Sequence, residues 1–225
     1  MTLSIAGRCA DTGQLGIAIS SSSIAVGARC PWIRSGVGAV SSQNITLPAL
    51  GPLTLDQLEQ GCLPDEALKH VLATNAYSPF RQLIAIDHQG RTAHFSGNRT
   101  LGVHAAVAGE QCVAAGNMLA SPSVIEAMIA AFESAPGHLA DRLIAAMQAG
   151  LDAGGEAGPL HSSALIVADD LVWPIVNLRV DWADDDPIGK LATLWQAYHP
   201  QMNDYLDRAL DPANAPGYGV PGDNR

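Results

Sequence analysis

The chain has 225 residues, of which 48% are hydrophobic and 15% are charged, a composition typical of a folded globular domain. Its formal net charge of −10 argues against binding to nucleic acid or to an anionic membrane, since both attract clustered Lys and Arg. No apolar run approaches the ~20 residues of a membrane helix, and no signal peptide is evident, so we expect a cytoplasmic protein.

The first 28 residues predict a β-hairpin followed by a stretch of small side chains. Residues 3–8 and 15–20 are β-rich, and Ala10–Gly13 between them forms a turn with glycine where a positive φ is wanted. Small residues dominate 20–28, and residues 37–42 then predict a third strand.

Helices are predicted in pairs rather than singly between strands. The first pair covers about residues 53–60, closed by Gly61, and a helix that begins at Pro64. The second pair begins near Ser123, which has capping-box spacing to Glu126, and continues over residues 139–153. The remaining predicted strands are residues 82–87, 91–96, 111–115, 163–167 and 175–180.

Paired helices fit poorly with a parallel βαβ wind, so we expect antiparallel sheets covered by the two helix pairs. A last helix is predicted to begin around Asp184–Pro187. With neither a repeat nor a linker, residues 1–210 are predicted to form a single domain, followed by a Pro/Gly-rich tail at 211–225.

Common catalytic and metal-binding motifs are missing from this sequence. The seven histidines show no ligand spacing, and the run Asp184–Asp186 is better explained by stabilisation of a helix N-terminus than by a metal site. The cysteines are dispersed without a Cys-x-x-Cys motif, so we expect reduced thiols: Cys9, Cys30, Cys62 and Cys112. Neither a metal nor a cofactor is implied.

Thr2 is the strongest candidate for catalysis. An N-terminal threonine combines a hydroxyl nucleophile with its own α-amine as base, and a chain-terminal amine ordinarily titrates with a pKa near 7.7–8.0. This role requires removal of Met1; otherwise Thr2 is only the first residue of a strand. Its hairpin and the small residues that follow place it well for the catalytic role.

Several segments carry a resemblance to a known family. They are "TLSIAGRCADTGQLGIAIS", "AVGARCPWIRSGVGAVSSQ", "GNMLASPSVIEAM" and "YGVPGD". Together they resemble an uncharacterised bacterial family, domain of unknown function 1028, placed among the N-terminal-nucleophile (Ntn) hydrolases. The resemblance implies an α+β fold, a four-layer αββα sandwich of two antiparallel sheets.

The resemblance also implies roles for individual residues. Thr2 matches the threonine with which the family begins. Ser21 could hydrogen-bond the α-amine or simply bond to backbone. Arg34 stands before the third strand, where related hydrolases keep a lysine, and could act electrostatically or lie on the surface.

Three amide side chains are candidates for stabilising an oxyanion. Gln43 and Asn44 end the third strand, where donors often lie in the superfamily. Asn117, beside Gly116, is a further candidate. Asn44 and Asn117 could equally be turn residues.

We therefore expect an Ntn-type amidohydrolase that cleaves a small amide or ureido compound through an acyl-enzyme. The alternative is a non-catalytic small-molecule binding protein that keeps the fold. A homodimer is a further expectation; nucleic-acid and membrane partners are not expected.

Overall fold

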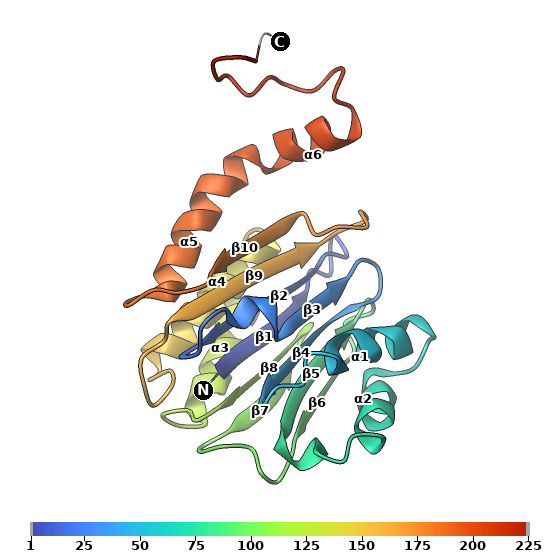
Figure 1. Cartoon of the computed structure of the whole chain (residues 1–225), viewed down its shortest axis with the longest axis vertical. Coiled ribbons are helices and arrows are strands. Elements are labelled where there is room, and N and C mark those ends of the chain that lie inside the picture. The colour runs from blue at the N-terminus through green and yellow to red at the C-terminus, as the bar shows by residue number, and fades with distance from the viewer. Residues whose placement is uncertain (1, 224–225) are drawn as a thin grey trace.

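Two antiparallel β-sheets lie face to face in the computed structural model, which describes residues 2–223 (Figure 1). The larger sheet has the order β10–β9–β2–β1–β8–β7: Val176–Val180, Ser162–Ala168, Leu15–Ser21, Thr2–Arg8, Cys112–Asn117 and Ala105–Gly109. The smaller sheet has the order β3–β4–β5–β6: Pro31–Arg34, Gly38–Asn44, Arg81–Asp87 and Thr92–Ser96. Strand β1 is therefore paired on both of its edges.

Helices cover the outer faces of the two sheets (Figure 1). The smaller sheet packs against α1 and α2: Leu50–Glu59 and Pro64–Ala73. The larger sheet packs against α3, α4 and α5: Ser123–Ser134, Leu139–Asp152 and Pro187–Tyr198. A sixth helix, α6, and three short 3-10 turns complete the helical segments: Met202–Leu210, Val26–Ala28, Ser78–Phe80 and His199–Gln201.

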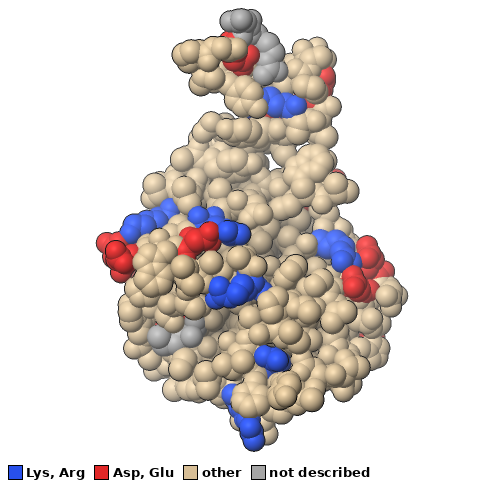
Figure 2. All heavy atoms as spheres, viewed as in Figure 1, with Lys and Arg blue, Asp and Glu red and all other residues tan. Residues whose placement is uncertain are grey.

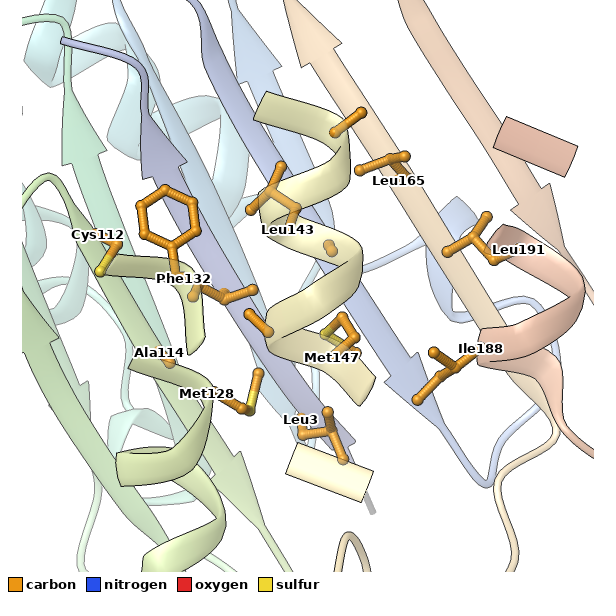
Figure 3. Close-up of a cluster of buried hydrophobic side chains, with 14 of the residues drawn as sticks. Leu3, Cys112, Ala114, Met128, Phe132, Leu143, Met147, Leu165, Ile188 and Leu191 are labelled. Carbon is orange, nitrogen blue, oxygen red and sulfur yellow. The ribbon is translucent and has the colours of Figure 1, made fainter. Parts of the chain in front are cut away.

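The alternation of side chains along β1 separates the two layers of the core. Leu3 and Ile5 point into the cluster beneath α3 and α4, whereas Ala6 lies in the cluster between the sheets. Figure 3 shows Leu3 beside Met147 in the helix-facing cluster. The same alternation turns Thr2 and Ser4 toward the smaller sheet, where Ser4 bonds to a β4 side chain.

A close approach of α3 to β1 requires glycine at position 7. A Cβ atom on Gly7 would lie 2.4 Å from Cζ of Phe132, a fully buried ring labelled in Figure 3. The Arg142 guanidinium lies over the Phe132 ring, 4.2 Å from the ring centroid.

The predicted fold class is confirmed: the order of layers is helix, sheet, sheet, helix. The N-terminal hairpin and both helix pairs are also confirmed. Strands β3 and β7 were not predicted, because β3 is only four residues long and starts with proline, and β7 (AAVAG) lacks strong β-formers.

Two predictions about the helices were wrong in detail. Ser123 does not cap α3; its hydroxyl instead bonds to the hydroxyl of Ser121 at 2.6 Å. The chain also continues through His199–Gln201 into α6 rather than ending its helices at α5. Asp186 does cap α5, accepting a hydrogen bond from the Gly189 N–H at 2.9 Å, as its place before Pro187 predicted.

Helix α6 and residues 211–223 extend away from the sheets as a C-terminal arm (Figure 1). Residues 211–223 contain neither helix nor strand. On the face drawn in Figure 2, charged side chains form small separate groups on a mostly uncharged surface.

Candidate active site

Thr2 lies at the first position of the central strand of the larger sheet. Its Cα partners are Ser21 on β2 and Asn117 on β8, so all three predicted site residues meet at one end of the sheet. Thr2 is 5% exposed. The register of the β1–β2 hairpin thus places Ser21 beside Thr2, and the antiparallel pairing of β1 with β8 places Asn117 on its other side.

Hydroxyl groups continue from Thr2 along β2. The Thr2 Oγ1 atom lies 3.3 Å from the Ser21 Oγ atom, a long hydroxyl–hydroxyl hydrogen bond. The Ser21 Oγ atom is 2.9 Å from the Ser23 Oγ atom and also accepts from the Ser23 backbone N–H at 3.1 Å. Ser21 is therefore not only a backbone-bonded strand serine, because its side chain touches the candidate nucleophile.

Behind these hydroxyls, amide side chains link the two sheets in a buried network. Gln82 Oε1 accepts from Gln43 Nε2 at 2.9 Å and from Asn117 Nδ2 at 3.0 Å. Gln82 Nε2 in turn donates to the Gly116 carbonyl at 2.9 Å. Sequence reasoning missed Gln82, since it reads only as one polar position of a predicted strand.

The side-chain N–H groups of the predicted oxyanion donors differ in how many of them already form hydrogen bonds. Gln43 Nε2 donates to Gln82 and to the Ala115 carbonyl, so both of its N–H groups are engaged. Within residues 2–223, Asn117 Nδ2 has one hydrogen-bond partner, which leaves its second N–H available there. The Asn117 Oδ1 atom is buried without a hydrogen-bond partner among the described residues.

Asn44 closes loops at the end of β4 rather than facing Thr2. Its Nδ2 atom donates to the Phe80 carbonyl at 2.6 Å, and its Oδ1 atom accepts from the Leu101 N–H at 3.3 Å. Its φ of 70° is the left-handed conformation that asparagine tolerates well. The structure therefore supports the turn interpretation of this residue.

Arg34 precedes β4, the strand predicted at residues 37–42, and is the last residue of the additional strand β3. It pairs across the sheet with Gly38, which is five residues, or about 17 Å, along β4 from Gln43. Its guanidinium forms ion pairs with Asp56 at 2.8 Å and with Glu59 at 2.7 Å on α1. The structure does not bring Arg34 to Thr2.

Glu156 is a further acidic residue at this end of the sheet that sequence reasoning missed. It forms an isolated antiparallel bridge with Leu119, two residues beyond Asn117. Backbone bonds on either side fix the loop: the Ala120 N–H donates to Gly155 and the Ala157 N–H donates to Met118. In the sequence, Gly154–Gly155 indicates only the end of a helix. Nothing in the local sequence pattern indicates that Glu156, the next residue, is buried near Thr2.

Glu156 is only 7% exposed, both of its carboxyl oxygens are buried, and neither oxygen has a hydrogen bond of normal geometry among the described residues. Burial raises its pKa to about 8, although the positive chain terminus and nearby Ser22 favour the charged form and act in the opposite direction. A carboxyl group that is costly to ionise therefore lies next to the strand end that holds Thr2.

This shift predicts a pH dependence of stability. Between pH 4.5 and about 8 the folded protein holds a proton that the unfolded chain releases, so the free energy of unfolding should fall as pH rises through this range. Glu156→Gln should remove this fall and be more stable than wild type at pH 8.5 by at least about 1.4 kcal/mol, the equivalent of one pKa unit. Urea denaturation at pH 5 and pH 8.5 measures the free energy of unfolding, and Glu126→Gln, at an exposed position, is the control. If Glu156→Gln lost as much stability between the two pH values as wild type and Glu126→Gln do, the prediction would be contradicted.

Two further features can be stated for residues 2–223. No three His, Cys, Asp or Glu side chains in this range are grouped to hold a metal ion, and the four cysteines are free thiols. In the same range, no helix has both the length and the apolar character needed to cross a bilayer.

The fold and the site thus define a class of protein: an αββα sandwich with a threonine at the start of its central strand. The chain belongs to the family of unknown function DUF1028, whose family model matches residues 2–191, which confirms the resemblance noted in the sequence. Protein SPO2555 from Silicibacter pomeroyi, of the same family, has a crystal structure with a TM-score of 0.85. It is 32% identical, and the match covers 91% of this chain and 89% of that one.

More distant solved structures are Anbu proteins. Anbu (ancestral beta-subunit) from Yersinia bercovieri is 11% identical with a TM-score of 0.41, covering 97% of this chain and 100% of that one. Anbu from Hyphomicrobium sp. strain MC1 is 10% identical with a TM-score of 0.40, covering 88% and 95%. A comparison with curated proteins finds no match.

Proposed function

We propose that this protein is an Ntn-type amidohydrolase whose nucleophile is the hydroxyl of Thr2. The observation that carries the proposal is the placement of Thr2 Oγ1 at the first position of the central strand, beside the Ser21 hydroxyl. The proposal requires removal of Met1, which lies outside the described residues.

The reaction begins when the α-amine of Thr2 takes the proton from Oγ1. The Oγ1 atom attacks the amide carbonyl carbon, and the C–N bond then breaks as the protonated amine delivers its proton to the leaving nitrogen. Water attacks the resulting ester, releasing the acid and restoring Thr2. Every atom comes from the chain, the substrate and water.

Neighbouring groups have defined parts in this scheme. The Ser21 hydroxyl orients Thr2 Oγ1. Asn117 Oδ1, a buried acceptor at the position paired with Thr2, receives a hydrogen bond from the α-amine, and the second N–H of Asn117 Nδ2 donates to the oxyanion. Gln43 and Gln82 hold Asn117 in place rather than touching the substrate.

The substrate is a small amide or ureido compound. A nucleophile on a residue that is only 5% exposed favours a small acyl group over a folded protein. No cofactor takes part in the scheme.

A non-catalytic binding protein is the second candidate. It is favoured by the engagement of both Gln43 N–H groups and by the ion pairs of Arg34, because two groups named for catalysis hold structure instead. In this case the same end of the sheet would bind a ligand without cleaving it.

The test is the intact mass of untagged protein expressed in bacteria, before and after treatment with a β-lactone that acylates N-terminal threonines. We expect a mass short by one methionine and a single adduct that maps to Thr2 and is absent from Thr2→Ala. Retention of Met1, or an adduct of equal yield on Thr2→Ala, would overturn the proposal and favour the binding protein.

A further inference from the structure

The segment that follows β2 brings the guanidinium of Arg29 to the end of the sheet where Thr2 lies. Arg29 Nη2 donates to the Ser23 hydroxyl at 3.2 Å. The Ser23 hydroxyl is 2.9 Å from that of Ser21, whose oxygen is in turn 3.3 Å from Thr2 Oγ1. Three side-chain contacts in series therefore connect the guanidinium with the candidate nucleophile, a separation that one small molecule can bridge.

The local backbone holds the Arg29 side chain in place. Its N–H closes the 3-10 turn Val26–Ala28 by donating to the Val26 carbonyl at 3.1 Å. The side chain turns back over the same segment, where Nη1 donates to the carbonyls of Ile24 and Ala25 at 2.5 and 3.2 Å. A guanidinium that is already held by backbone acceptors loses little further conformational entropy when it binds a ligand.

Two of the five N–H donors of Arg29 have no hydrogen-bond partner within residues 2–223. The bonds to Ile24, Ala25 and Ser23 account for the others, which leaves the Nε–H and one N–H of Nη2. Arg29 is only partly buried and Ser23 is exposed, so a solute can reach the guanidinium. Two N–H donors on one guanidinium can pair with both oxygens of a carboxylate.

The charge of Arg29 also lacks a carboxylate partner within residues 2–223, since none of the ion pairs there includes it. The carbonyl of Asp181 accepts from the Ala25 N–H, but its carboxylate pairs with Arg179 at 3.0 and 2.8 Å. Burial raises the pKa of Glu156 to about 8, so near neutral pH this acid holds a proton and does not repel an anion. In a chain with a net charge of −10, the guanidinium is therefore a local attraction for a negatively charged ligand.

We propose that Arg29 binds a carboxylate of the substrate, which is therefore an amide or ureido compound with an acidic group a few atoms from the bond that Thr2 attacks. The contacts that carry this inference are those that lead from Arg29 through Ser23 and Ser21 to Thr2. The assignment of a substrate class rests on the proposed function, whereas the binding of a carboxylate does not.

The test compares hydantoate, the ureido acid N-carbamoylglycine, with its uncharged amide as the isostere. Both are titrated into full-length Thr2→Ala, which lacks the proposed nucleophile, at about pH 6.5, where the guanidinium and the probe carboxylate are both charged. NMR follows the Arg29 Nε–H signal and the backbone amides. We expect hydantoate to bind at least about ten-fold more tightly than its amide, with shifts centred on residues 21–29.

Arg29→Gln, added to the same protein, should weaken hydantoate binding at least about ten-fold and leave the affinity for the amide within about two-fold, because only the acid pairs with the guanidinium. Retained affinity for the amide also shows that the site is folded. Lys69→Gln is the matched control: it removes the same formal charge from an exposed position on α2 and should change both affinities less than about two-fold.

Three results would overturn the inference: no binding of hydantoate, equal affinity for acid and amide, or hydantoate binding unchanged by Arg29→Gln. Equal loss of both probes in Arg29→Gln would also overturn it, because Arg29 would then only hold the segment 24–29 in place.

The β-lactone test on wild type separates this inference from the proposed function. Preference for hydantoate together with failure of acylation would leave the carboxylate site standing and remove the hydrolase. Successful acylation of Thr2 without a preference for hydantoate would keep the hydrolase and overturn the acidic substrate class.

Discussion

Thr2→Ala is expected to hydrolyse any amide that the wild type cleaves at least about 10³-fold more slowly, because the attacking oxygen is lost altogether. The comparison is kcat/KM on one substrate under one set of conditions. Thr2→Ser keeps a hydroxyl and an α-amine in the same place and should retain measurable turnover. The two variants together separate loss of the nucleophile from loss of the strand.

Thr12→Ala is the matched control for this experiment. Thr12 is exposed in the hairpin turn, where its Oγ1 atom accepts a hydrogen bond from the Gln14 N–H at 3.3 Å. Its rate should stay within about two-fold of wild type, a change well below 1 kcal/mol. Full activity of Thr2→Ala would rule out an acyl-enzyme on Thr2.

Gln82→Leu is expected to lower the free energy of unfolding by about 3 kcal/mol. The Gln82 side chain accepts from Gln43 and Asn117 and donates to Gly116, three buried hydrogen bonds, and it also donates to the partly buried Ser96. Leucine would remove the one acceptor that the Asn117 amide has among residues 2–223 and one of the two acceptors of Gln43 Nε2, and each orphaned group costs about 1–3 kcal/mol.

Urea denaturation measures this loss, and Gln89→Leu is the control. Gln89 is exposed in the turn between β5 and β6, where its backbone N–H donates to the Asp87 carboxylate at 2.9 Å. The control should change stability by no more than about 0.5 kcal/mol. If Gln82→Leu changed the free energy of unfolding by as little as the control does, the buried amide network would not contribute to stability as predicted.

The fold and part of the site were predictable from the sequence because their signals are local. The N-terminal hairpin fixed the pairing of Thr2 with Ser21, since a short turn sets the register of the strands around it. Alternation along β1 likewise separated Leu3 from Thr2. Paired helices were enough to indicate antiparallel sheets.

The rest of the site depends on pairings between segments far apart in the chain. Thr2 meets Asn117 across 115 positions, and Glu156 is brought near them by an isolated bridge to Leu119 and the backbone hydrogen bonds beside it. The spacing of apolar residues in the sequence does not indicate such a bridge. Gln82 was hidden for the same reason, because its partners come from β4 and β8.

Arg34 illustrates a missed local signal. Asp56 and Glu59 stand three residues apart on α1 and so share one face of that helix. A basic side chain on the strand beneath can form ion pairs with both carboxylates on this face. These ion pairs explain the position of Arg34 without a catalytic role.

The position of β1 between β2 and β8 sets an order of events during synthesis. Strand β2 emerges from the ribosome directly after β1, but β8 follows only once nearly half of the chain has been made. Until then the first residues have a free edge and are accessible to an aminopeptidase, whereas in the finished sheet Thr2 is paired on both sides. For the proposed hydrolase we therefore expect Met1 to be removed from the nascent chain, and an N-terminal purification tag to be cleaved more slowly once the protein has folded.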